Sequence, residues 1–138
     1  KKIIKIKETF FVVNCDGLLK LSPNQLLNFH KENKNDLTLV AALKKFSVPY
    51  GVCEVNKING KLNNMEEKPQ KNVIANAGLY ICEPKIFKYL PAKKSFGMNE
   101  LIKNLLRKKR KVGVFPIKDT DWQDTGNWLD YMNVIKQS

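Results

Sequence analysis

Short runs of apolar residues alternate along this chain with stretches of helical periodicity, and their order predicts an α/β fold. Residues 9–14 and 37–43 are apolar runs too short for helices, a pattern typical of strands buried on both faces. Between them, Ser22 at the N-cap and Pro23 at the first position predict a helix that ends near Asn33. A strand, a helix and a strand in this order predict parallel pairing of the two strands through a right-handed crossover.

The middle of the chain predicts a β-hairpin. A loop is expected at residues 44–49, and residues 50–55 have the alternating polarity of a strand. Asn59-Gly60 is a strong hairpin turn signal, and residues 62–67 return as the partner strand. A short polar loop then leads into a further strand at residues 74–82.

The last third of the chain returns to alternating helices and strands. Glu83-Pro84 predicts a short helix, and Asn99 is the predicted cap of a longer one. A strand follows at residues 112–117, and Asn127 is placed to cap a last helix at residues 128–135. Because no repeat or polar linker divides the 138 residues, we predict one α/β domain. Its mixed, mostly parallel sheet has flanking helices and a β-hairpin extension.

A large positive charge distinguishes the composition. The chain has 25 lysines and arginines against 13 acids, a formal net charge of +12, which suits binding to nucleic acid, membranes or phosphorylated small molecules. Residues 107–111 are all cationic, which indicates either a nucleic-acid patch or cations at a helix C-terminus. The second interpretation is favoured, because no aromatic residues interleave with them as on a base-stacking surface.

Two features bear on the compartment. Residues 1–7 alternate lysine with isoleucine, which predicts an opening strand or extended arm rather than a signal peptide, and no apolar run approaches the roughly 20 residues that cross a bilayer. Cys15, Cys53 and Cys82 lie in predicted strands without the spacing of metal ligands. We therefore expect buried thiols in a reducing compartment and a cytoplasmic protein.

Charged residues and a glycine at strand ends mark a candidate binding site. In Glu66-Glu67-Lys68-Pro69 the proline fixes its own φ and favours an extended Lys68. Gly78 interrupts the strand segment Asn76-Ala77-Gly78-Leu79-Tyr80, and glycine inside a strand often marks close approach of a ligand to the backbone. The two polar clusters, joined by a loop, indicate one binding site, although a hairpin with a solvated edge accounts for the same residues.

Two aspartates are further candidates. Asp16 follows the first buried strand, at the strand end where open α/β sheets bind ligands, although Asp16-Gly17 is also an ordinary turn pair. Asp124 closes an acidic run that contains Trp122, and an acid before a helix N-terminus is also favoured by electrostatics alone. The single histidine, His30, is predicted to be a partly exposed helix residue rather than a catalytic base.

Five segments spread along the whole chain together resemble a known family. They are residues 10–16, Tyr50-Gly51, Glu66-Glu67-Lys68-Pro69, Asn76-Ala77-Gly78-Leu79-Tyr80 and Trp122-Gln123-Asp124-Thr125-Gly126. In this order they are similar to the sugar-1-phosphate nucleotidylyltransferases, also called NDP-sugar pyrophosphorylases. Each segment is weak evidence alone, and the set is specific.

The resemblance implies a partial Rossmann-like nucleotidyltransferase fold and a metal-dependent reaction. The phosphate oxygen of a sugar 1-phosphate attacks the α-phosphorus of an NTP in line, and pyrophosphate leaves. Asp16 and Asp124 match the family's Mg²⁺ ligands, and Lys68 matches the lysine that contacts the sugar phosphate as a mobile point charge. The other matches are substrate-binding residues: Glu67 and Asn76 for sugar hydroxyls, Gly51 through its backbone amide, and Trp122 and Tyr80 as walls of the site.

The chain departs from the family in two respects. Cys15 stands where the family often has glycine directly before the first metal aspartate. No glycine-rich NTP loop of the type Gly-x-Gly-Thr-Arg-Leu occurs in residues 1–138. The resemblance therefore implies a single incomplete domain, the carboxyl-terminal portion of the catalytic domain without its amino-terminal NTP loop, and we expect this chain to be inactive alone.

The expected partners follow from the resemblance. They are a sugar 1-phosphate and an NTP, in the biosynthesis of surface polysaccharide or glycoconjugates. We expect no binding to nucleic acid or membranes, and an uncovered sheet edge that favours pairing with a second copy into a homo-oligomer. Two other hypotheses stay open: a non-catalytic sugar-phosphate-binding regulatory module, and a basic nucleic-acid-binding domain.

Overall fold

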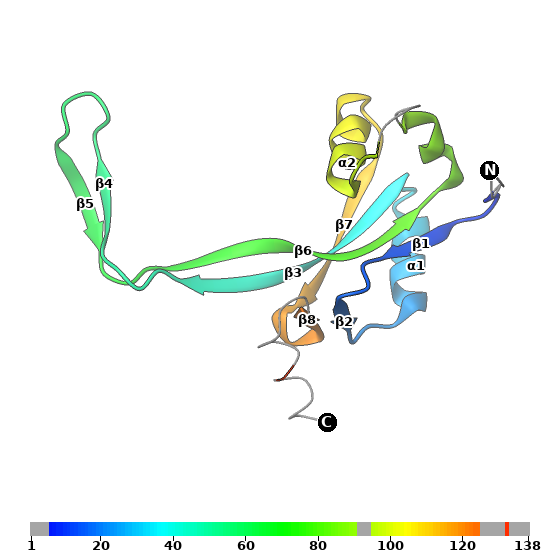
Figure 1. The fold of residues 1–138 in the computed structure, drawn as a ribbon, viewed down its shortest axis with the longest axis horizontal. Helices are drawn as coiled ribbons and strands as arrows, with labels where there is room; N and C mark the ends of the chain where they lie inside the picture. Colours follow the sequence, from blue (N-terminus) through cyan, green and yellow to red (C-terminus); the bar gives the residue numbers. More distant parts are fainter. Residues whose placement is uncertain (1–5, 91–94, 125–131, 133–138) are drawn as a thin grey trace.

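A four-stranded mixed sheet forms the body of the protein (Figure 1). The structure is a computed structural model that describes residues 6–90, 95–124 and 132. The strands lie in the order β1 (Phe10–Val13), β6 (Gln70–Cys82), β3 (Leu37–Ser47) and β7 (Val112–Lys118). β6 pairs antiparallel with β1 and with β3, whereas β3 pairs parallel with β7, so β1, β3 and β7 run in one direction. The predicted α/β class with a mixed sheet is confirmed.

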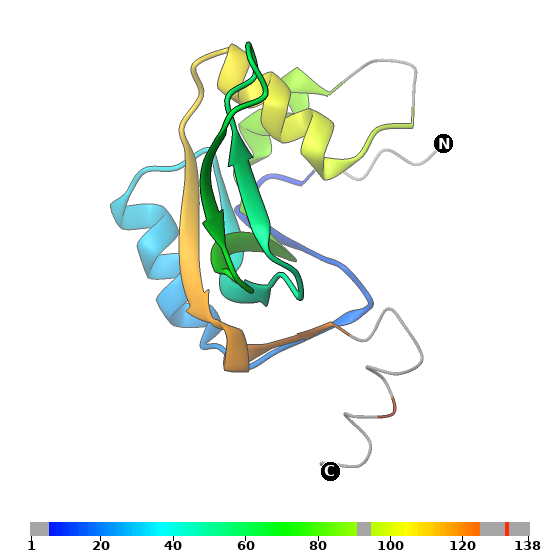
Figure 2. The same cartoon turned by 90° about the vertical axis from the view of Figure 1, so that its left-hand side faces the viewer.

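Helices cover both faces of this sheet (Figure 2). On one face, α1 (Pro23–Glu32) contributes Leu26 to a core with Val40, Ala42, Ala77, Leu79, Ile81 and Ile117. On the other, α2 (Met98–Arg107) and the 3-10 helix η1 (Pro84–Tyr89) share a core that consists of Leu37, Tyr80, Cys82, Ile86, Leu101 and Leu105. Alternate residues of β6 serve the two cores, as the two-residue period of a strand requires. No helix in the described part of the chain is long and apolar enough to cross a membrane.

β1 and β3, which are predicted to pair through the helix between them, are not neighbours, so this predicted pairing is wrong. β6 lies between β1 and β3, and Tyr80 is in register with Val12 on one side and Leu39 on the other. The connection through a helix sets the common direction of β1 and β3 and leaves room for a later strand between them. Residues 77–82 of β6 are buried throughout, which suits a strand with neighbours on both edges and helices on both faces.

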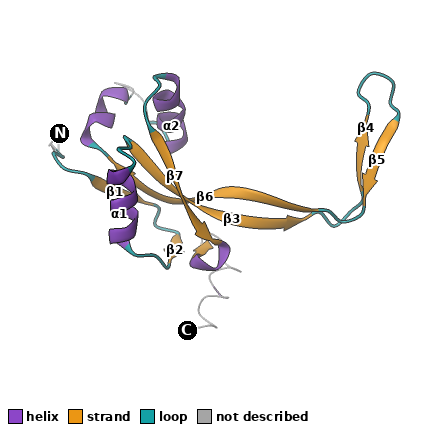
Figure 3. Cartoon of the chain, turned by 180° about the vertical axis from the view of Figure 1, so that it is seen from behind, coloured by secondary structure: helices purple, strands orange, loops and turns teal. Residues whose placement is uncertain are grey.

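β3 and β6 continue beyond the body as a two-stranded ribbon that ends in a hairpin (Figures 1 and 3). Their register runs on from Leu43↔Ile74 to Ser47↔Gln70, so the loops predicted at residues 44–49 and 70–73 are largely strand. Pairing gives these backbone groups hydrogen-bond partners within the chain. The hairpin consists of β4 (Val52–Val55) and β5 (Leu62–Glu66), paired antiparallel. Its predicted turn at Asn59-Gly60 is confirmed, and Gly60 has a φ of +69°.

The two helix starts differ in how well the sequence predicts them. α1 has Ser22 at its N-cap and Pro23 as its first residue, as predicted. α2 has Gly97 at its N-cap, so the predicted cap Asn99 is wrong and lies inside the first turn. The backbone at Gly97 is extended, with φ −95° and ψ 163°, which allows its carbonyl to accept the first helical hydrogen bonds. The predicted last helix and its cap lie outside the described residues apart from Met132.

α1 and α2 each end in a left-handed residue that is a lysine. After α2, Lys109 N–H donates to Leu106 O at 2.9 Å and Arg110 N–H donates to Leu105 O at 2.9 Å, the paired bonds of a Schellman motif. Lys109 has a φ of +52°, and Lys34 has a φ of +50° in the same place after α1. Glycine is preferred at this position because a Cβ atom is disfavoured at positive φ.

Of the three cysteines, only Cys82 is buried. Burial, with a smaller effect of Glu83, raises the pKa of the Cys82 thiol to about 12, so this thiol stays protonated. Cys15 and Cys53 are exposed, and the prediction of buried thiols is wrong for both. Cys15 follows the end of β1, and Cys53 lies on the hairpin, whose strands are mostly exposed in the described part of the chain.

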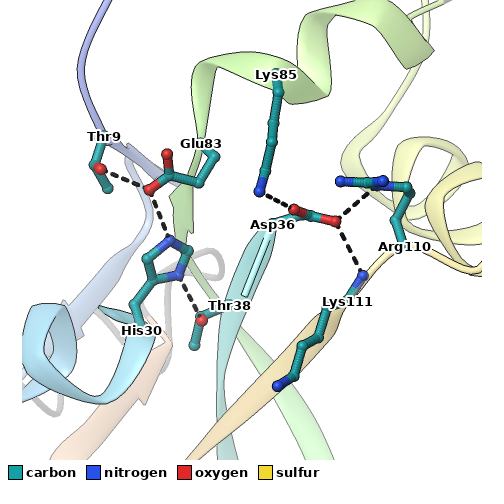
Figure 4. Close-up of polar contacts among 8 residues, drawn as sticks. All are labelled: Thr9, His30, Asp36, Thr38, Glu83, Lys85, Arg110 and Lys111. Atoms are coloured by element: carbon teal, nitrogen blue, oxygen red, sulfur yellow. Dashed lines mark hydrogen bonds and ion pairs between the residues drawn. The ribbon is translucent and has the colours of Figure 1, made fainter. Parts of the chain in front are cut away.

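The buried carboxylate of Asp36 joins several chain segments at one end of the sheet (Figure 4). Asp36 is 3% exposed. Lys85 forms an ion pair with Oδ1, Arg110 Nε lies 2.8 Å from Oδ2, and Lys111 N–H donates to Oδ2 at 3.1 Å. The Asp36 carbonyl accepts a hydrogen bond from Glu83 N–H at 3.0 Å. Burial alone would raise the pKa of Asp36, but the donors outweigh it and lower this pKa.

His30 is buried beside this carboxylate, so its predicted partial exposure is wrong. Its ring Nδ1 lies 2.7 Å from Thr38 Oγ1 and its Nε2 lies 3.2 Å from Glu83 Oε1 (Figure 4). Thr9 Oγ1 donates to the same oxygen of Glu83 at 2.7 Å, and Asn35 Nδ2 donates to Thr38 Oγ1 at 2.9 Å. Burial lowers the pKa of His30 although Glu83 opposes the shift. The imidazole is therefore neutral at pH 7.

Replacing Lys109 by glycine should stabilise the protein. Glycine adopts this left-handed conformation without the Cβ penalty of about 1–2 kcal/mol, and its greater freedom in the unfolded chain offsets part of that gain. We expect the free energy of unfolding, measured by chemical denaturation, to rise by roughly 0.5–1 kcal/mol. Lys103→Gly removes the same charge from the middle of α2 and should lower the free energy of unfolding by about 1 kcal/mol. Equal effects of the two substitutions would contradict the C-terminal assignment.

The neutral state of His30 predicts a loss of stability in mild acid. Because its pKa is lower in the folded chain than in the unfolded one, the unfolded state binds more protons below about pH 6.5. The free energy of unfolding has its full value above that pH and falls as the pH drops toward the pKa of His30 in the folded chain. The loss is about 1.4 kcal/mol for each unit by which folding lowers this pKa. Denaturation of wild type and His30→Gln at pH 7.5, 6 and 5 measures this. His30 is the single histidine, so the slope should be much shallower in the variant; equal slopes would refute the assignment.

Candidate functional site

A small second sheet lies at the end of the body away from Asp36. β2 (Gly17–Leu19) pairs antiparallel with β8 (Trp122–Asp124), which follows β7 through the short 3-10 helix η2 (Asp119–Asp121). The register places Gly17 opposite Asp124. The backbone at Asp16 therefore lies next to that at Asp124, and Asp16 is exposed. The fold thus brings the two predicted metal aspartates, which are far apart in the sequence, onto neighbouring segments.

The adjoining part of β6 carries a hydrogen-bonded group around Asn76. Asn76 Nδ2 donates to the Tyr80 hydroxyl at 2.7 Å, and Asn76 Oδ1 accepts from Gly78 N–H at 3.1 Å. Asn76 is exposed, whereas Tyr80 is 3% exposed. Asn14 N–H donates to Gly78 O at 2.8 Å, so the end of β1 also touches this group. Sequence reasoning did not single out Asn14, because no sequence signal links it to Gly78.

Trp122 and Tyr80 lie on opposite faces of the sheet. Trp122 packs against the core on the α1 side, and Tyr80 belongs to the core on the α2 side. Lys44 Nζ lies 4.6 Å from the centre of the Trp122 ring and 2.6 Å from Asp119 Oδ1. A Cβ atom on Gly17 would lie 3.5 Å from Trp122 Nε1. Trp122 therefore packs beside β2, close to the predicted metal aspartates, and Tyr80 lies away from it.

The remaining predicted site residues gather at the junction between the ribbon and the hairpin. A Cβ atom on Gly51 would lie 3.0 Å from Glu67 Oε2, so the Glu67 carboxylate lies against the Gly51 backbone. Lys68 N–H donates to Tyr50 O at 3.2 Å. Lys68 has a φ of +47°, so the predicted extended conformation is wrong. A lysine held in the left-handed region before a proline is strained.

The predicted site residues therefore form two groups rather than one cluster. β6 is continuous from Gln70 to Cys82, so no loop folds Lys68 back toward Asn76. The six residue-to-residue steps from Gln70 to Asn76 span roughly 20 Å. Asp16, Asn76 and Trp122 lie at the body, and the group at the junction lies at the far end of the ribbon.

The pairing of β2 with β8 bears on the Mg²⁺ site that the resemblance implies. Mg²⁺ is usually bound by one or two protein carboxylates, and substrate phosphates and water complete its shell. Asp16 and Asp124 are on neighbouring backbone segments, as two carboxylate ligands of one ion would have to be. In residues 6–90, 95–124 and 132, no group of three or more His, Cys, Asp and Glu forms a metal site. A cation here would thus depend on the aspartate pair together with ligands from elsewhere.

Comparison with known proteins gives the relationships of the chain. The family model for nucleotidyl transferase matches residues 1–138. A glucose-1-phosphate adenylyltransferase from Acetivibrio thermocellus is 30% identical over 146 residues, covering 91% of this chain and 33% of that protein. A probable mannose-1-phosphate guanylyltransferase from Oryza sativa is 24% identical over 131 residues, covering 94% and 36%.

Solved structures share the fold. A putative glucose-1-phosphate thymidylyltransferase from Bacillus anthracis, in complex with sucrose, matches with a TM-score of 0.63 at 18% identity, covering 95% of this chain and 55% of that chain. HddC from Yersinia pseudotuberculosis matches with a TM-score of 0.62 at 23% identity, covering 94% and 55%. The chain spans about a third of the length of the curated relatives and about half of these structures.

Replacing Gly78 by alanine should destabilise the protein more than the same change at Gly60. Both glycines have positive φ, +74° and +69°, so alanine meets the same backbone penalty of about 1–2 kcal/mol at each. At Gly78 the new Cβ would also lie 2.8 Å from the Asn14 side chain, whereas at Gly60 nothing lies within 4 Å. We expect an additional loss of about 1–2 kcal/mol at Gly78, measured by denaturation. Equal losses would show that Asn14 does not occupy this space.

Proposed function

The chain belongs to the nucleotidyl transferase family, and we propose that it carries the sugar-phosphate side of a reaction that joins a sugar 1-phosphate to an NTP. The products would be an NDP-sugar and pyrophosphate. The observation that carries this proposal is the pairing of Gly17 with Asp124, since it brings two aspartates from distant parts of the chain onto neighbouring segments. A Cβ atom on Gly17 would lie 3.8 Å from Ala77 O, so these segments adjoin the part of β6 that follows Asn76. Such a reaction depends mainly on positioning and on neutralising phosphate charge.

Each residue has a proposed role. Asp16 and Asp124 would hold Mg²⁺, which when bound neutralises charge on the phosphate oxygens. Asn76 would hydrogen-bond sugar hydroxyls, and Trp122 would pack behind the metal side of the site. Glu67, Gly51 and Lys68 would meet the sugar and its phosphate from the ribbon. Because roughly 20 Å of strand separates them from Asn76, this role requires the ribbon to bend toward the body when the ligand binds.

The substrate class follows from the names of the relatives. One acts on glucose 1-phosphate and another on mannose 1-phosphate, so we propose that the sugar substrate is a hexose 1-phosphate. We further propose a cytoplasmic role, the supply of activated sugars for surface polysaccharides or glycoconjugates. The NTP would contact parts of the enzyme that this chain lacks, because no glycine-rich loop occurs in residues 1–138.

Titration calorimetry with glucose 1-phosphate and mannose 1-phosphate, with and without Mg²⁺, tests the proposal. We expect one of the two sugars to bind more tightly when Mg²⁺ is present. Asp16→Asn should reduce the gain in affinity that Mg²⁺ produces. We expect a reduction of at least roughly 10-fold, as is typical when a residue that supports a metal site is lost. Glu54→Gln removes an exposed carboxylate from the hairpin and serves as the matched control.

The outcomes separate the hypotheses. Absence of binding to both sugar phosphates would overturn the proposed function. Binding that Mg²⁺ does not affect would instead favour the non-catalytic regulatory module. The 138-residue chain should release no pyrophosphate from NTP and sugar 1-phosphate mixtures, and turnover would contradict the expectation that the nucleotide site is missing.

A further inference from the structure

We propose that Tyr80 and Gly78 are positioning residues that hold the Asn76 carboxamide in one orientation before a ligand arrives. This inference rests on the proposed role of Asn76 in binding sugar hydroxyls. It assigns Tyr80 a different task from the one expected, since Tyr80 acts through Asn76 instead of lining the site. It also adds Asn14 as the residue that fixes Gly78.

Both ends of the Asn76 side chain have a partner in the protein. Nδ2 donates to the Tyr80 hydroxyl at 2.7 Å, and Oδ1 accepts from Gly78 N–H at 3.1 Å. A carboxamide that turned by 180° would place an oxygen against the Tyr80 hydroxyl and an NH₂ against Gly78 N–H. The second contact would pair two donors, so the hydrogen bonds favour one orientation.

The two partners are themselves held firmly. Tyr80 is 3% exposed and lies between β1 and β3, in register with Val12 and Leu39. Its ring is part of the core on the α2 side, so the hydroxyl has little freedom to move. A tyrosine hydroxyl at the edge of a core normally finds a hydrogen-bond partner, and here that partner is Asn76.

Gly78 is held by the end of β1. Its φ of +74° is a conformation that suits glycine. The Asn14 side chain fills the space where a Cβ atom would lie, at 2.8 Å, and Asn14 N–H donates to Gly78 O at 2.8 Å. Gly78, the residue that supplies the N–H to Asn76, is therefore positioned by the residue that directly follows β1.

The arrangement leaves Asn76 with a defined set of free groups. A carboxamide has two N–H donors and two acceptor lone pairs, and the protein uses one of each. One donor and one acceptor remain on an exposed side chain. Sugar hydroxyls can both donate and accept, so this pair matches hydroxyls at defined positions. A group oriented beforehand avoids the loss of side-chain freedom on binding and helps to distinguish sugars that differ at one hydroxyl.

A double-mutant cycle with Tyr80→Phe and Asn76→Ala tests the proposal. The readout is the affinity of the chain for glucose 1-phosphate and mannose 1-phosphate, measured by calorimetry. Removal of one hydrogen bond that orients Asn76 should weaken the preferred sugar about 3- to 10-fold and reduce the preference between the two sugars. In the Asn76→Ala background, Tyr80→Phe should have no further effect, because no carboxamide remains to be oriented.

Tyr89→Phe is the matched control. It removes a hydroxyl from a partly buried tyrosine in η1, away from Asn76, and should leave both affinities unchanged. If Tyr80→Phe weakens binding equally with and without Asn76, its role is general packing and the proposal is wrong. If Tyr80→Phe has no effect in the wild-type background, the proposal is also wrong.

The Asn76 side-chain amide provides a readout that needs no ligand. In the nuclear magnetic resonance spectrum of wild type, its two protons should have shifts distinct from those of exposed asparagines. Tyr80→Phe should move them toward the exposed values, and Tyr89→Phe should not. If wild type binds neither sugar phosphate, the proposed function fails while this spectrum still tests the positioning. Unchanged Asn76 signals in Tyr80→Phe would overturn the positioning itself.

Discussion

Asp36 is nearly inaccessible to water, yet it stays charged because donors from separate parts of the chain surround it. Lys85 comes from η1, Arg110 follows α2, and Lys111 directly precedes β7. Taking a carboxylate out of water is costly unless its oxygens are paired and hydrogen-bonded. The fold can therefore bury Asp36 only when these segments meet at the start of β3. This requirement ties the beginnings of β3 and β7 to the end of β6.

The position of the candidate site follows from that arrangement. β3 and β7 start together at Asp36 and run parallel in register from Leu37↔Val112 to Leu43↔Lys118. β7 therefore ends at a defined position along β3, and the chain then turns through η2 into β8. β8 then pairs with β2, which follows β1. The buried polar cluster at one end of the sheet thus helps to set where the segments that carry Asp16 and Asp124 meet at the other end.

Local signals predicted many of the elements. The apolar runs of β1 and β3, the Ser22-Pro23 start of α1 and the Asn59-Gly60 turn are each determined by neighbours in the sequence. Several of the errors occurred where a distant partner decides the outcome. β3 continues past Leu43 because β6 pairs with it. His30 of α1 is buried where Thr38 of β3 and Glu83, which follows β6, come to it.

The candidate site also combines features that the sequence determines with features that only the tertiary structure decides. The sequence alone determined the residue types at strand ends, the glycine that interrupts β6 and the family to which the five segments point. Only the tertiary structure decided that Asp16 and Asp124 are on paired segments, that Tyr80 faces Asn76 from the core, and that Lys68 lies a ribbon's length away. The physical reason is the range of the interactions. Turns, caps and strand periodicity depend on residues a few positions apart, whereas strand pairing and burial join segments that the sequence keeps far from one another.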